Sequence, residues 1–406
     1  GRGSFHRSER LGVRGSRMVT STSPHPNSLP AGKGVANRVR LAIICQHLTM
    51  GGAEELVLGI ATHLPTDRYE LRVLCLSEQG VIADELRAAG VRVDVLPGEP
   101  GPRDTRAFAR LVAHLRGWRP HIVHTFLLNA VLYGRLAAIV AGVPLIFAAE
   151  QNIYLHKASR HALMERILAK RTCRIIACCH AVSDFYQRQV KVPPAKLVVI
   201  LNAVRYEQFL PLPSRAASHA ALGLDPDLPT VGLIGRLTRQ KGHDVLLHAV
   251  RKLKKSYPQL QVVIAGQGEA RPGLETLARE LEIERNIHFV GLRRDREHLY
   301  GAFDVFALPS RWEGLSLALA EAVGAGIPTV ATDVGGNREV IESDCSGLLV
   351  PGDDPTALAM ALERLLGDHE LRRRLSERGI VEVRPRFGID RHVQQLDALY
   401  TYALAS

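Results

Sequence analysis

Two glutamates eight positions apart are the residues of this chain whose types and spacing point most directly to chemistry. Glu313 follows a short apolar run that predicts a strand, and Glu321 lies in the alanine-rich run after it, which predicts a helix. A strand-to-helix turn presents free backbone N–H groups and the positive end of a helix dipole, where an anion can bind. An ionised carboxylate beside such a turn accepts hydrogen bonds from hydroxyl groups. The pair therefore predicts a ligand that carries both phosphate and sugar.

A basic segment follows another predicted strand in the same half of the chain. Residues 235–242 read Gly-Arg-Leu-Thr-Arg-Gln-Lys-Gly and include Arg236 and Lys241. Arginine offers a planar fork of donors and lysine a mobile point charge, so the two together suit a diphosphate. A solvated basic loop is an equally good interpretation of this segment taken alone.

Four further segments place glycines where a strand meets a helix. Residues 266–268 and 333–339 predict tight turns, and residues 289–294 predict either a loop that holds a nucleobase edge or an ordinary connection. Gly51 and Gly52 lie in a loop of the first half, where the missing side chains allow backbone to approach a ligand closely. Because the carboxyl ends of parallel strands share one edge, we expect these loops to meet across a cleft between two domains.

The elements that must position these residues alternate between apolar strands and helices. Continuous apolar strands between helices predict parallel sheets covered on both faces. The pattern loosens over 203–228, so we expect two doubly wound halves rather than one long sheet. The predicted strands span residues 39–45, 71–76, 91–96, 121–125, 144–149, 174–179, 197–201, 230–234, 261–265, 287–290, 304–308, 328–332 and 347–350.

The predicted fold class is α/β, with two Rossmann-like domains that face a central cleft. We expect an N-terminal domain over residues 39–205, completed by a C-terminal helix at 386–404, and a C-terminal domain over 206–385. Residues 1–38 are rich in Gly, Ser, Pro and Arg without a hydrophobic period, which predicts a disordered basic tail. Met18 is a candidate for the natural start of the chain.

Composition excludes several classes of protein. The chain has 406 residues, of which 46% are apolar and 23% charged, as in ordinary globular proteins. No apolar stretch reaches the roughly 18 residues of a membrane-spanning helix. The six cysteines have no spacing typical of a metal site, which predicts free thiols in a reducing cytoplasm. Most of the net charge of +11 lies in residues 1–40, which carry eight Lys/Arg and one acid.

A second basic region lies in residues 151–205, with a net charge of +8. Leucine and isoleucine recur at helical spacing within residues 157–174. One interpretation is a helix that rests on anionic lipid and brings the protein to a membrane-bound partner. We expect instead that the apolar stripe packs on the domain's own sheet, as such stripes normally do.

Taken together, these segments resemble the retaining glycosyltransferases of family 4, which have the two-domain architecture called GT-B. The resemblance extends from about residue 39 to residue 404 and is most specific over residues 307–342. That stretch contains Pro-Ser-Arg-Trp-Glu-Gly-Leu-Ser, the second glutamate, and Gly-Gly-Asn-Arg-Glu. The resemblance implies a sugar transfer from a nucleotide-sugar donor.

The resemblance also implies roles for the candidate residues. Arg236 and Lys241 would bind the diphosphate and stabilise the departing nucleotide, which would make a metal ion unnecessary. Glu313 would hydrogen-bond hydroxyls of the transferred sugar, and Glu321 would hold the ribose. The other expected donor-binding residues are Gly52, Gly235, Gly291, Leu292, Arg293, Gly314, Leu315 and Ser316, with residues 291–293 carrying the base.

The chain departs from the family pattern at one position in the first half. Family members often have a histidine near the sugar after the fifth strand, and Gln151 stands where we expect it. His124, at the end of the preceding predicted strand, is the alternative candidate for an active-site histidine. A histidine at a strand end is equally compatible with a structural role.

Three classes of function remain open from the sequence. The main prediction is a glycosyltransferase that uses a nucleotide sugar, with UDP-sugar favoured, and a glycan, lipid-linked or small-molecule acceptor. Another enzyme of the same architecture, such as a nucleotide-sugar epimerase or a glycosyl phosphorylase, is the second class. A polyanion-binding module is the third, although the sequence has no nucleic-acid recognition motif and few aromatic residues. The expected location is the cytoplasm, with peripheral contact at the inner face of a membrane if the basic helix binds lipid.

Overall fold

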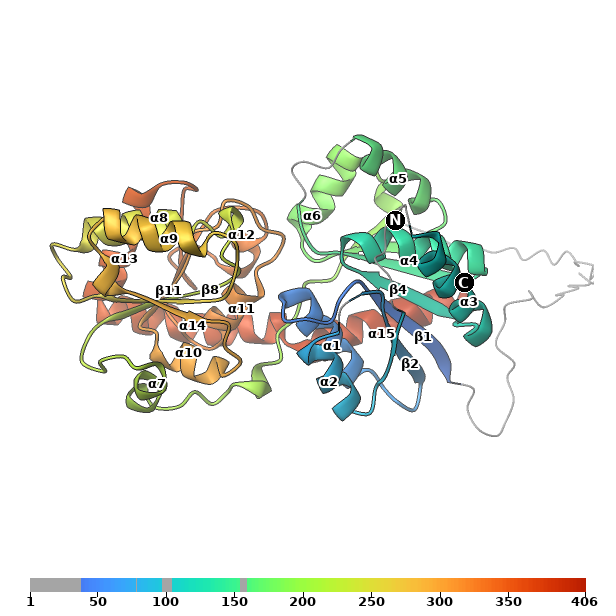
Figure 1. The fold of residues 1–406 in the computed structure, drawn as a ribbon, viewed down its shortest axis with the longest axis horizontal. Coiled ribbons are helices and arrows are strands. Elements are labelled where there is room, and N and C mark those ends of the chain that lie inside the picture. Colours follow the sequence, from blue (N-terminus) through green and yellow to red (C-terminus); the bar gives the residue numbers. More distant parts are fainter. Residues whose placement is uncertain (1–37, 78, 97–103, 154–158) are drawn as a thin grey trace, which may run out of the picture.

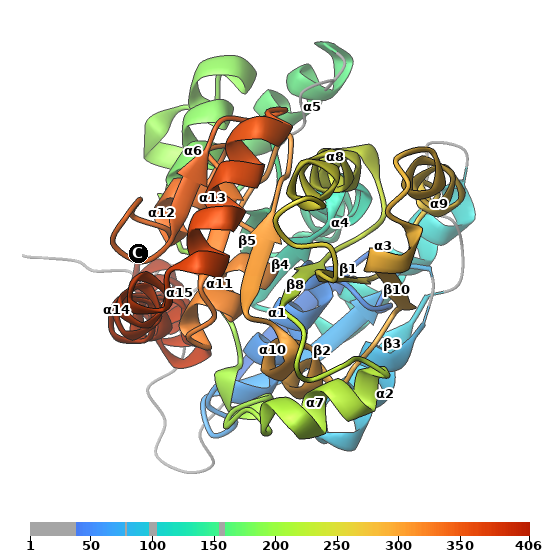
Figure 2. The same cartoon turned by 90° about the vertical axis from the view of Figure 1, so that its left-hand side faces the viewer.

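The computed structural model describes residues 38–77, 79–96, 104–153 and 159–406. They form two lobes, each with a parallel sheet between layers of helices, joined by crossing chain segments (Figure 1; Figure 2). The predicted α/β class with two doubly wound halves is confirmed. The predicted basic tail lies outside the described residues, apart from Arg38.

The first lobe contains a seven-stranded parallel sheet in the order β3-β2-β1-β4-β5-β6-β7. Strand β1, in the interior of this sheet, is almost continuously apolar and buried, as expected of a strand covered on both faces. The strands are β1 (Val39–Cys45), β2 (Tyr69–Cys75), β3 (Arg92–Val95), β4 (Ile122–Phe126), β5 (Leu145–Glu150), β6 (Arg174–Ala177) and β7 (Leu197–Val199).

Helices cover both faces of this sheet. One face packs against α3 and α4, and the other packs against α1, α2 and the C-terminal helix α15 (Ile389–Ala405). Asp104 caps α3 by accepting a hydrogen bond from the backbone N–H of Ala107. The helices of this lobe are α1 (Gly52–His63), α2 (Val81–Ala88), α3 (Thr105–Trp118), α4 (Leu128–Ala141), α5 (Ser159–Ala169) and α6 (His180–Phe185).

The second lobe contains a six-stranded parallel sheet in the order β10-β9-β8-β11-β12-β13. The strand order reverses beside β8, as it does beside β1 in the first sheet, so each lobe has a switch point where its loops separate. The strands are β8 (Thr230–Ile234), β9 (Gln261–Ala265), β10 (Ile287–Gly291), β11 (Val305–Leu308), β12 (Thr329–Thr332) and β13 (Leu348–Val350).

The helices of the second lobe also lie on both faces of their sheet. One face carries α8, α9 and α13, whereas α10 and α11 pack on the other (Figure 2). Asp354 caps α13, with Pro355 at its first position. The helices are α7 (Arg215–Leu222), α8 (His243–Leu253), α9 (Arg271–Glu280), α10 (Arg296–Ala302), α11 (Leu317–Gly324), α12 (Asn337–Val340), α13 (Pro355–Gly367) and α14 (His369–Phe387).

The chain crosses between the lobes twice, and the two crossings are hydrogen-bonded to each other. The Val204 N–H donates to the Phe387 carbonyl at 2.7 Å, and the Ile389 N–H donates to the Val204 carbonyl at 3.1 Å. After α14, helix α15 (Ile389–Ala405) returns to the first lobe and packs against α1 (Figure 1). The hydroxyl of Tyr69 donates to Asp397 at 2.6 Å, which fixes the returning helix to β2.

The basic helix α5 differs from the expectation that its apolar stripe is buried. Leu163, Met164 and Ile167 are 50%, 42% and 52% exposed, so this part of the stripe faces outward. The inner face carries the buried side chains of Leu168 and Ala169 and a fully buried ion pair between Glu165 and Arg135 of α4. The helical period alone did not reveal which face the ion pair would turn inward.

Candidate active site

Glu313 lies in the loop that leaves β11 at the carboxyl edge of the second sheet. Its side chain is buried, and its Oε1 accepts hydrogen bonds from Ser310 Oγ at 2.7 Å and from Lys241 Nζ at 2.6 Å. Burying a carboxylate is costly unless it is paired and hydrogen-bonded, and both conditions hold here. The structure therefore brings together Glu313, the carboxylate predicted to bind the sugar, and Lys241, one of the two cations predicted to bind the diphosphate.

Lys241 reaches Glu313 from the loop after β8. Its aliphatic stem packs against Gly235, where an added Cβ would lie 3.4 Å from the lysine Cδ. Gly242 follows with a φ of 65°, and a Cβ there would lie 2.0 Å from the Pro309 carbonyl oxygen. The side chain of Arg236 is exposed, and it has no hydrogen bond or ion pair with any residue that the structure describes. The loop thus presents one cation paired to Glu313 and one that is open to an anion.

Helix α11 begins directly after the Glu313 loop, with Ser316 as its N-cap. The first lobe meets this helix end at Gly52, where an added Cβ would lie 3.3 Å from Leu317 Cδ1. Gly52 is itself the first residue of α1, so the N-terminal ends of two helices from different lobes face each other. Such ends carry unpaired N–H groups and a partial positive charge, which favour an anion between them. The side chain of Leu315 is buried in the core, so only its backbone can contact a ligand.

The Glu313 loop also touches the first lobe at Gly314. A Cβ on Gly314 would lie 2.2 Å from the Gln151 carbonyl oxygen, and Cys179 Sγ lies 3.3 Å from the Gly314 carbonyl oxygen. Gln151 therefore lies beside the site, although its side-chain oxygen accepts a hydrogen bond from Asn202 at 2.6 Å. The position where the family often has a histidine is thus adjacent to the Glu313 loop in this chain too.

Glu321 lies in the second turn of α11, as predicted, and is buried. Its Oε1 accepts a hydrogen bond from Arg296 Nη1 at 2.7 Å, and its Oε2 accepts one from the Tyr300 hydroxyl at 2.7 Å. Burial alone would lower the pKa of the Arg296 guanidinium, but the negative charges of Glu321 and Glu55 outweigh this effect, so the pKa is raised above its usual value. Arg296 therefore stays charged beside the predicted ribose carboxylate.

The predicted base loop leaves β10 at Gly291, which has a φ of 72°. The Gly291 carbonyl accepts a hydrogen bond from the Gly266 N–H at 2.7 Å, which ties this loop to the turn after β9. Leu292 is 48% exposed, whereas the Arg293 guanidinium is held by Asp295. The backbone and Leu292 are therefore free to meet a base, and the Arg293 side chain is already paired.

His124 does not lie at the cleft, which corrects its candidacy as an active-site histidine. The residue is 1% exposed, and its ring packs among Phe126, Phe147 and Tyr400. Its Nδ1 is 2.7 Å from the Tyr400 hydroxyl, and burial lowers the pKa of the imidazole to about 3. The side chain points from β4 toward α15 because both faces of a parallel sheet are covered by helices.

Sequence reasoning missed the polar groups that support the two glutamates. Ser310 lies three residues before Glu313, while Arg296 and Tyr300 lie four residues apart on α10. The second spacing places both side chains on one face of a helix, which is a detectable signal. Nothing in the sequence indicates that this face is turned toward Glu321.

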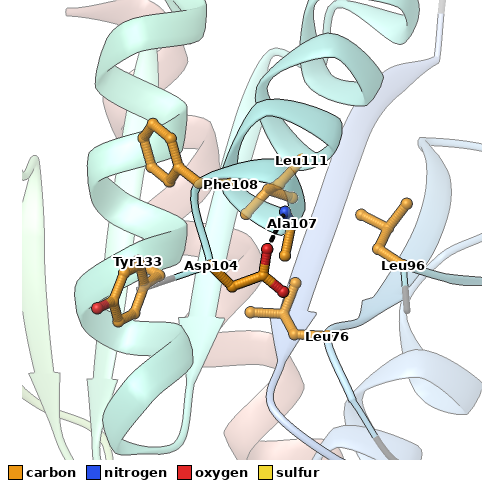
Figure 3. A pocket seen from close by; sticks show the side chains of 7 residues that line it. All are labelled: Leu76, Leu96, Asp104, Ala107, Phe108, Leu111 and Tyr133. Carbon is orange, nitrogen blue, oxygen red and sulfur yellow. Dashed lines mark hydrogen bonds between the residues drawn. The ribbon is translucent and has the colours of Figure 1, made fainter. Parts of the chain in front are cut away.

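Two cavities differ in size and in place. A cavity of about 310 Å³ lies where the lobes meet, lined by Met50, Glu55, Glu85, Gln208, Phe209, Arg294, Arg296 and Glu297. A second pocket lies within the first lobe, between the ends of β2 and β3 and helices α3 and α4 (Figure 3). Its volume is about 10 Å³, so it is too small for a sugar, and two of its lining residues, Asp104 and Ala107, are joined by the hydrogen bond that caps α3 (Figure 3).

Two further features bear on the predicted absence of a metal site and of membrane spans. Within the described residues, Glu342, Cys345 and Glu382 are the one group with metal-ligand spacing, and it includes none of the predicted donor-binding residues. No helix in the described part of the chain is long and apolar enough to cross a membrane.

Comparisons with known proteins assign a family to each lobe. The family described as Glycosyl transferases group 1 matches residues 214–381, and the family described as Glycosyltransferase Family 4 matches residues 50–208. The chain is 26% identical over 353 residues to the UDP-Gal:alpha-D-GlcNAc-diphosphoundecaprenol alpha-1,3-galactosyltransferase of Escherichia coli, covering 84% of this chain and 91% of that protein. It is 29% identical over 389 residues to the D-inositol 3-phosphate glycosyltransferase of Streptomyces bingchenggensis, covering 87% and 85%.

A solved structure shares the arrangement of both lobes. HepE from Anabaena, in complex with UDP-glucose, matches with a TM-score of 0.81 and 21% identity, covering 90% of this chain and 100% of that chain. The predictions of a GT-B fold and of a transferase are confirmed by these matches, and a polyanion-binding module is not favoured. The chain belongs to the group 1 and family 4 glycosyltransferases and is an enzyme with the GT-B fold.

Proposed function

We propose that this enzyme transfers a sugar from a UDP-sugar donor to an acceptor hydroxyl, with retention of the anomeric configuration. The observation that carries the proposal is the ion pair between Lys241 and Glu313, 2.6 Å long, beside the N-terminus of α11. The pair places a cation for phosphate and an acceptor for sugar hydroxyls within one hydrogen bond of each other. Gly52 of the other lobe packs against Leu317, at the same end of α11.

In the proposed reaction, the bond between the anomeric carbon and the diphosphate oxygen breaks as the acceptor oxygen bonds to the same face of that carbon. Negative charge grows on the departing diphosphate, which takes up the proton of the acceptor hydroxyl. Lys241, Arg236 and the N–H groups at the start of α11 stabilise that charge where it develops. Glu313 accepts hydrogen bonds from hydroxyls of the sugar and holds its anomeric carbon toward the acceptor.

We propose that no divalent metal takes part, because these cations fill the role that a metal ion would otherwise have. Lys241 is already fixed by Glu313, and Arg236 is exposed without a partner among the described side chains. Activity should therefore persist after dialysis against EDTA. A loss of activity that Mg²⁺ or Mn²⁺ restores would contradict this part of the proposal.

The choice of UDP rests on the relatives. The Escherichia coli relative is named for a UDP-Gal donor, and the Anabaena structure contains UDP-glucose. A nucleotide-release assay over a panel of UDP-, GDP- and ADP-sugars tests the choice. We expect acceptor-dependent release of UDP from at least one sugar of the panel. Release of GDP or ADP alone would overturn the donor assignment, and isomerised donor formed without acceptor would favour an epimerase instead.

We also propose that the acceptor is lipid-linked and that α5 rests on an anionic membrane surface, at the cytoplasmic face. Leu163, Met164 and Ile167 form an exposed apolar patch, and Arg166 and Lys170 are exposed beside it. Apolar side chains flanked by cations suit the boundary between acyl chains and anionic headgroups. The relative whose name includes a diphosphoundecaprenol acceptor supports a lipid-linked substrate.

Co-sedimentation with vesicles tests the membrane contact. The wild-type protein should sediment with vesicles that contain phosphatidylglycerol and remain free of pure phosphatidylcholine vesicles. The double variant Leu163→Ser/Ile167→Ser should lose this binding. A matched control is Met360→Ser/Val381→Ser, which removes two apolar side chains elsewhere on the surface that are even more exposed than Leu163 and Ile167. Equal binding of the two double variants would contradict a role for α5.

A further inference from the structure

Arg296 connects the predicted ribose carboxylate to the opposite lobe. It is the first residue of α10, and its Nη1 donates to Glu321 Oε1 at 2.7 Å. Its Nη2 lies 3.3 Å from Glu55 Oε2 on α1 and 3.0 Å from Gln208 Oε1 in the crossing segment. One guanidinium thus contacts a carboxylate of each lobe, and it forms part of the wall of the 310 Å³ cavity.

The contacts to Glu321 fix its carboxylate without using all of its acceptor sites. An ionised carboxylate has about four lone-pair sites. Arg296 and the Tyr300 hydroxyl each take one, on opposite oxygens, which leaves one on each oxygen for a ligand hydroxyl. Two adjacent hydroxyls, as on a ribose, match two free acceptor sites on one carboxylate. The guanidinium also offsets the cost of burying the negative charge of Glu321.

Glu55 holds Arg296 from the side of the first lobe. Its Oε2 accepts a hydrogen bond from Arg205 Nη2 at 2.6 Å as well as the contact from Arg296. Glu55 lies three residues after Gly52, in the first turn of α1. The orientation of Arg296 against Glu321 therefore depends on where α1 sits relative to the second lobe.

We propose that Arg296 is a positioning residue for ribose recognition. It holds the Glu321 carboxylate in the orientation that binds the ribose, and its own orientation depends on Glu55 of the other lobe. The proposal rests on the proposed function, since it takes Glu321 as the residue that binds the ribose. Arg296 acts through Glu321 and contacts no reacting atom. Donor binding then depends, through one side chain, on how the two lobes are placed relative to each other.

A second pair across the same cavity provides a matched control. Glu85 of α2 forms an ion pair with Arg294, so it also connects the first lobe to an arginine of the second. Arg294 has no contact with Glu321 among the described residues. Loss of the Glu85 pair should therefore weaken the contact between the lobes without changing how Glu321 is held.

The test compares binding of UDP with binding of 2′,3′-dideoxy-UDP by titration calorimetry. In the wild-type protein, UDP should bind roughly tenfold or more tightly, because two hydrogen bonds to a charged acceptor are at stake. In Arg296→Ala this ratio should fall below about threefold, and Arg296→Lys should keep part of it, because lysine can still pair with Glu321. Melting temperatures close to that of the wild type show that each variant is folded.

The glutamate variants separate positioning from general cohesion of the lobes. Glu55→Gln should lower the UDP to dideoxy-UDP ratio, should add nothing to Arg296→Ala, and should differ from Glu85→Gln, which should leave the ratio unchanged. An equal loss of affinity for both nucleotides in Arg296→Ala would overturn the proposal, as would equal effects of the two glutamate variants. A wild-type protein that binds none of UDP, GDP and ADP would overturn the proposed function and this proposal together. If Arg296→Ala still binds UDP more tightly than dideoxy-UDP by the wild-type ratio, the role of Arg296 is overturned and the proposed function stands.

Discussion

Strands β4 and β11 occupy equivalent places in the two lobes, yet their polar residues do different things. Each pairs with the first strand of its sheet, β1 or β8, at the point where the strand order reverses. A titratable side chain lies on or near each strand. His124 lies within β4, and Glu313 lies five residues beyond the end of β11. Both side chains are almost fully buried.

The difference lies in what surrounds each side chain. His124 is enclosed by three aromatic rings and its pKa is lowered by burial, so it is neutral and remote from solvent. Glu313 is enclosed by a lysine, a serine and backbone at the interface between the lobes. Of these two buried polar groups, the one at the candidate site is the one that lies past the carboxyl end of its strand, where ligands bind in open α/β sheets.

The largest expected effect separates these two residues by activity. Glu313→Ala and Lys241→Ala should each lower kcat/KM by about 10²–10³-fold or more, because each removes charge or hydrogen bonding where the transition state needs it. His124→Asn should keep kcat/KM within about threefold, because asparagine can still accept the hydrogen bond of the Tyr400 hydroxyl. Initial rates of nucleotide release, measured over a range of donor concentrations with saturating acceptor, give kcat/KM for each of the three variants.

The control for this experiment is folding. All three variants should show the far-UV circular dichroism of the wild type. Turnover at the wild-type rate in Glu313→Ala or Lys241→Ala would contradict the assignment of the active site to this part of the C-terminal lobe. A loss in His124→Asn as large as in Glu313→Ala would mean that the two strands carry equivalent chemistry after all.

A smaller effect is expected where the two lobes touch. An added Cβ on Gly314 would lie 2.2 Å from the Gln151 carbonyl oxygen, whereas one on Gly52 would lie 3.3 Å from the end of the Leu317 side chain. Backbone cannot move aside as a leucine methyl can, so Gly314→Ala should displace the Glu313 loop and lower kcat/KM roughly 10²-fold. Gly52→Ala should cost less than about tenfold. The same rate assay checks both, and equal costs would contradict the geometry of the interface.

Much of the fold could be predicted because parallel sheets need continuously apolar strands. All thirteen predicted strands match observed ones within two residues at each end, from β1 at Val39–Cys45 to β13 at Leu348–Val350. The placement of Glu313 after a strand and of Glu321 within a helix was also visible from local pattern. These features depend on short segments, where burial and turn chemistry leave a direct signal.

Features that depend on the packing of distant segments could not be predicted. Arg296 and Glu55 are 241 residues apart, and their contact exists only because of how the lobes are oriented. His124 failed as a candidate because both faces of a parallel strand are buried, so its sequence does not reveal which way a side chain points. The expectation for α5 held only in part: Leu168 is buried, whereas Leu163 and Ile167 face outward. The sequence does not show that Glu165 forms a buried pair with Arg135 on the inner face.

The smallest expected effect concerns stability and would sharpen the contrast between His124 and Glu313. Burial lowers the pKa of His124 to about 3 and that of His392 to about 4, whereas an unfolded histidine titrates near pH 6.5. Below about pH 6.5 the unfolded chain therefore binds protons that the folded chain does not, so stability falls as pH falls, with a slope that approaches about 1.4 kcal/mol per pH unit for each histidine. His124→Asn removes one of these protons, so the free energy of unfolding should fall less steeply between pH 6.5 and pH 5.5, by about 1 kcal/mol over that interval. Urea unfolding at the two pH values measures the slope, with Glu313→Ala, which keeps both histidines, as the control that should follow the wild type. Identical slopes in His124→Asn and the wild type would mean that His124 is accessible to protons in the folded protein, as a residue of the cleft would be.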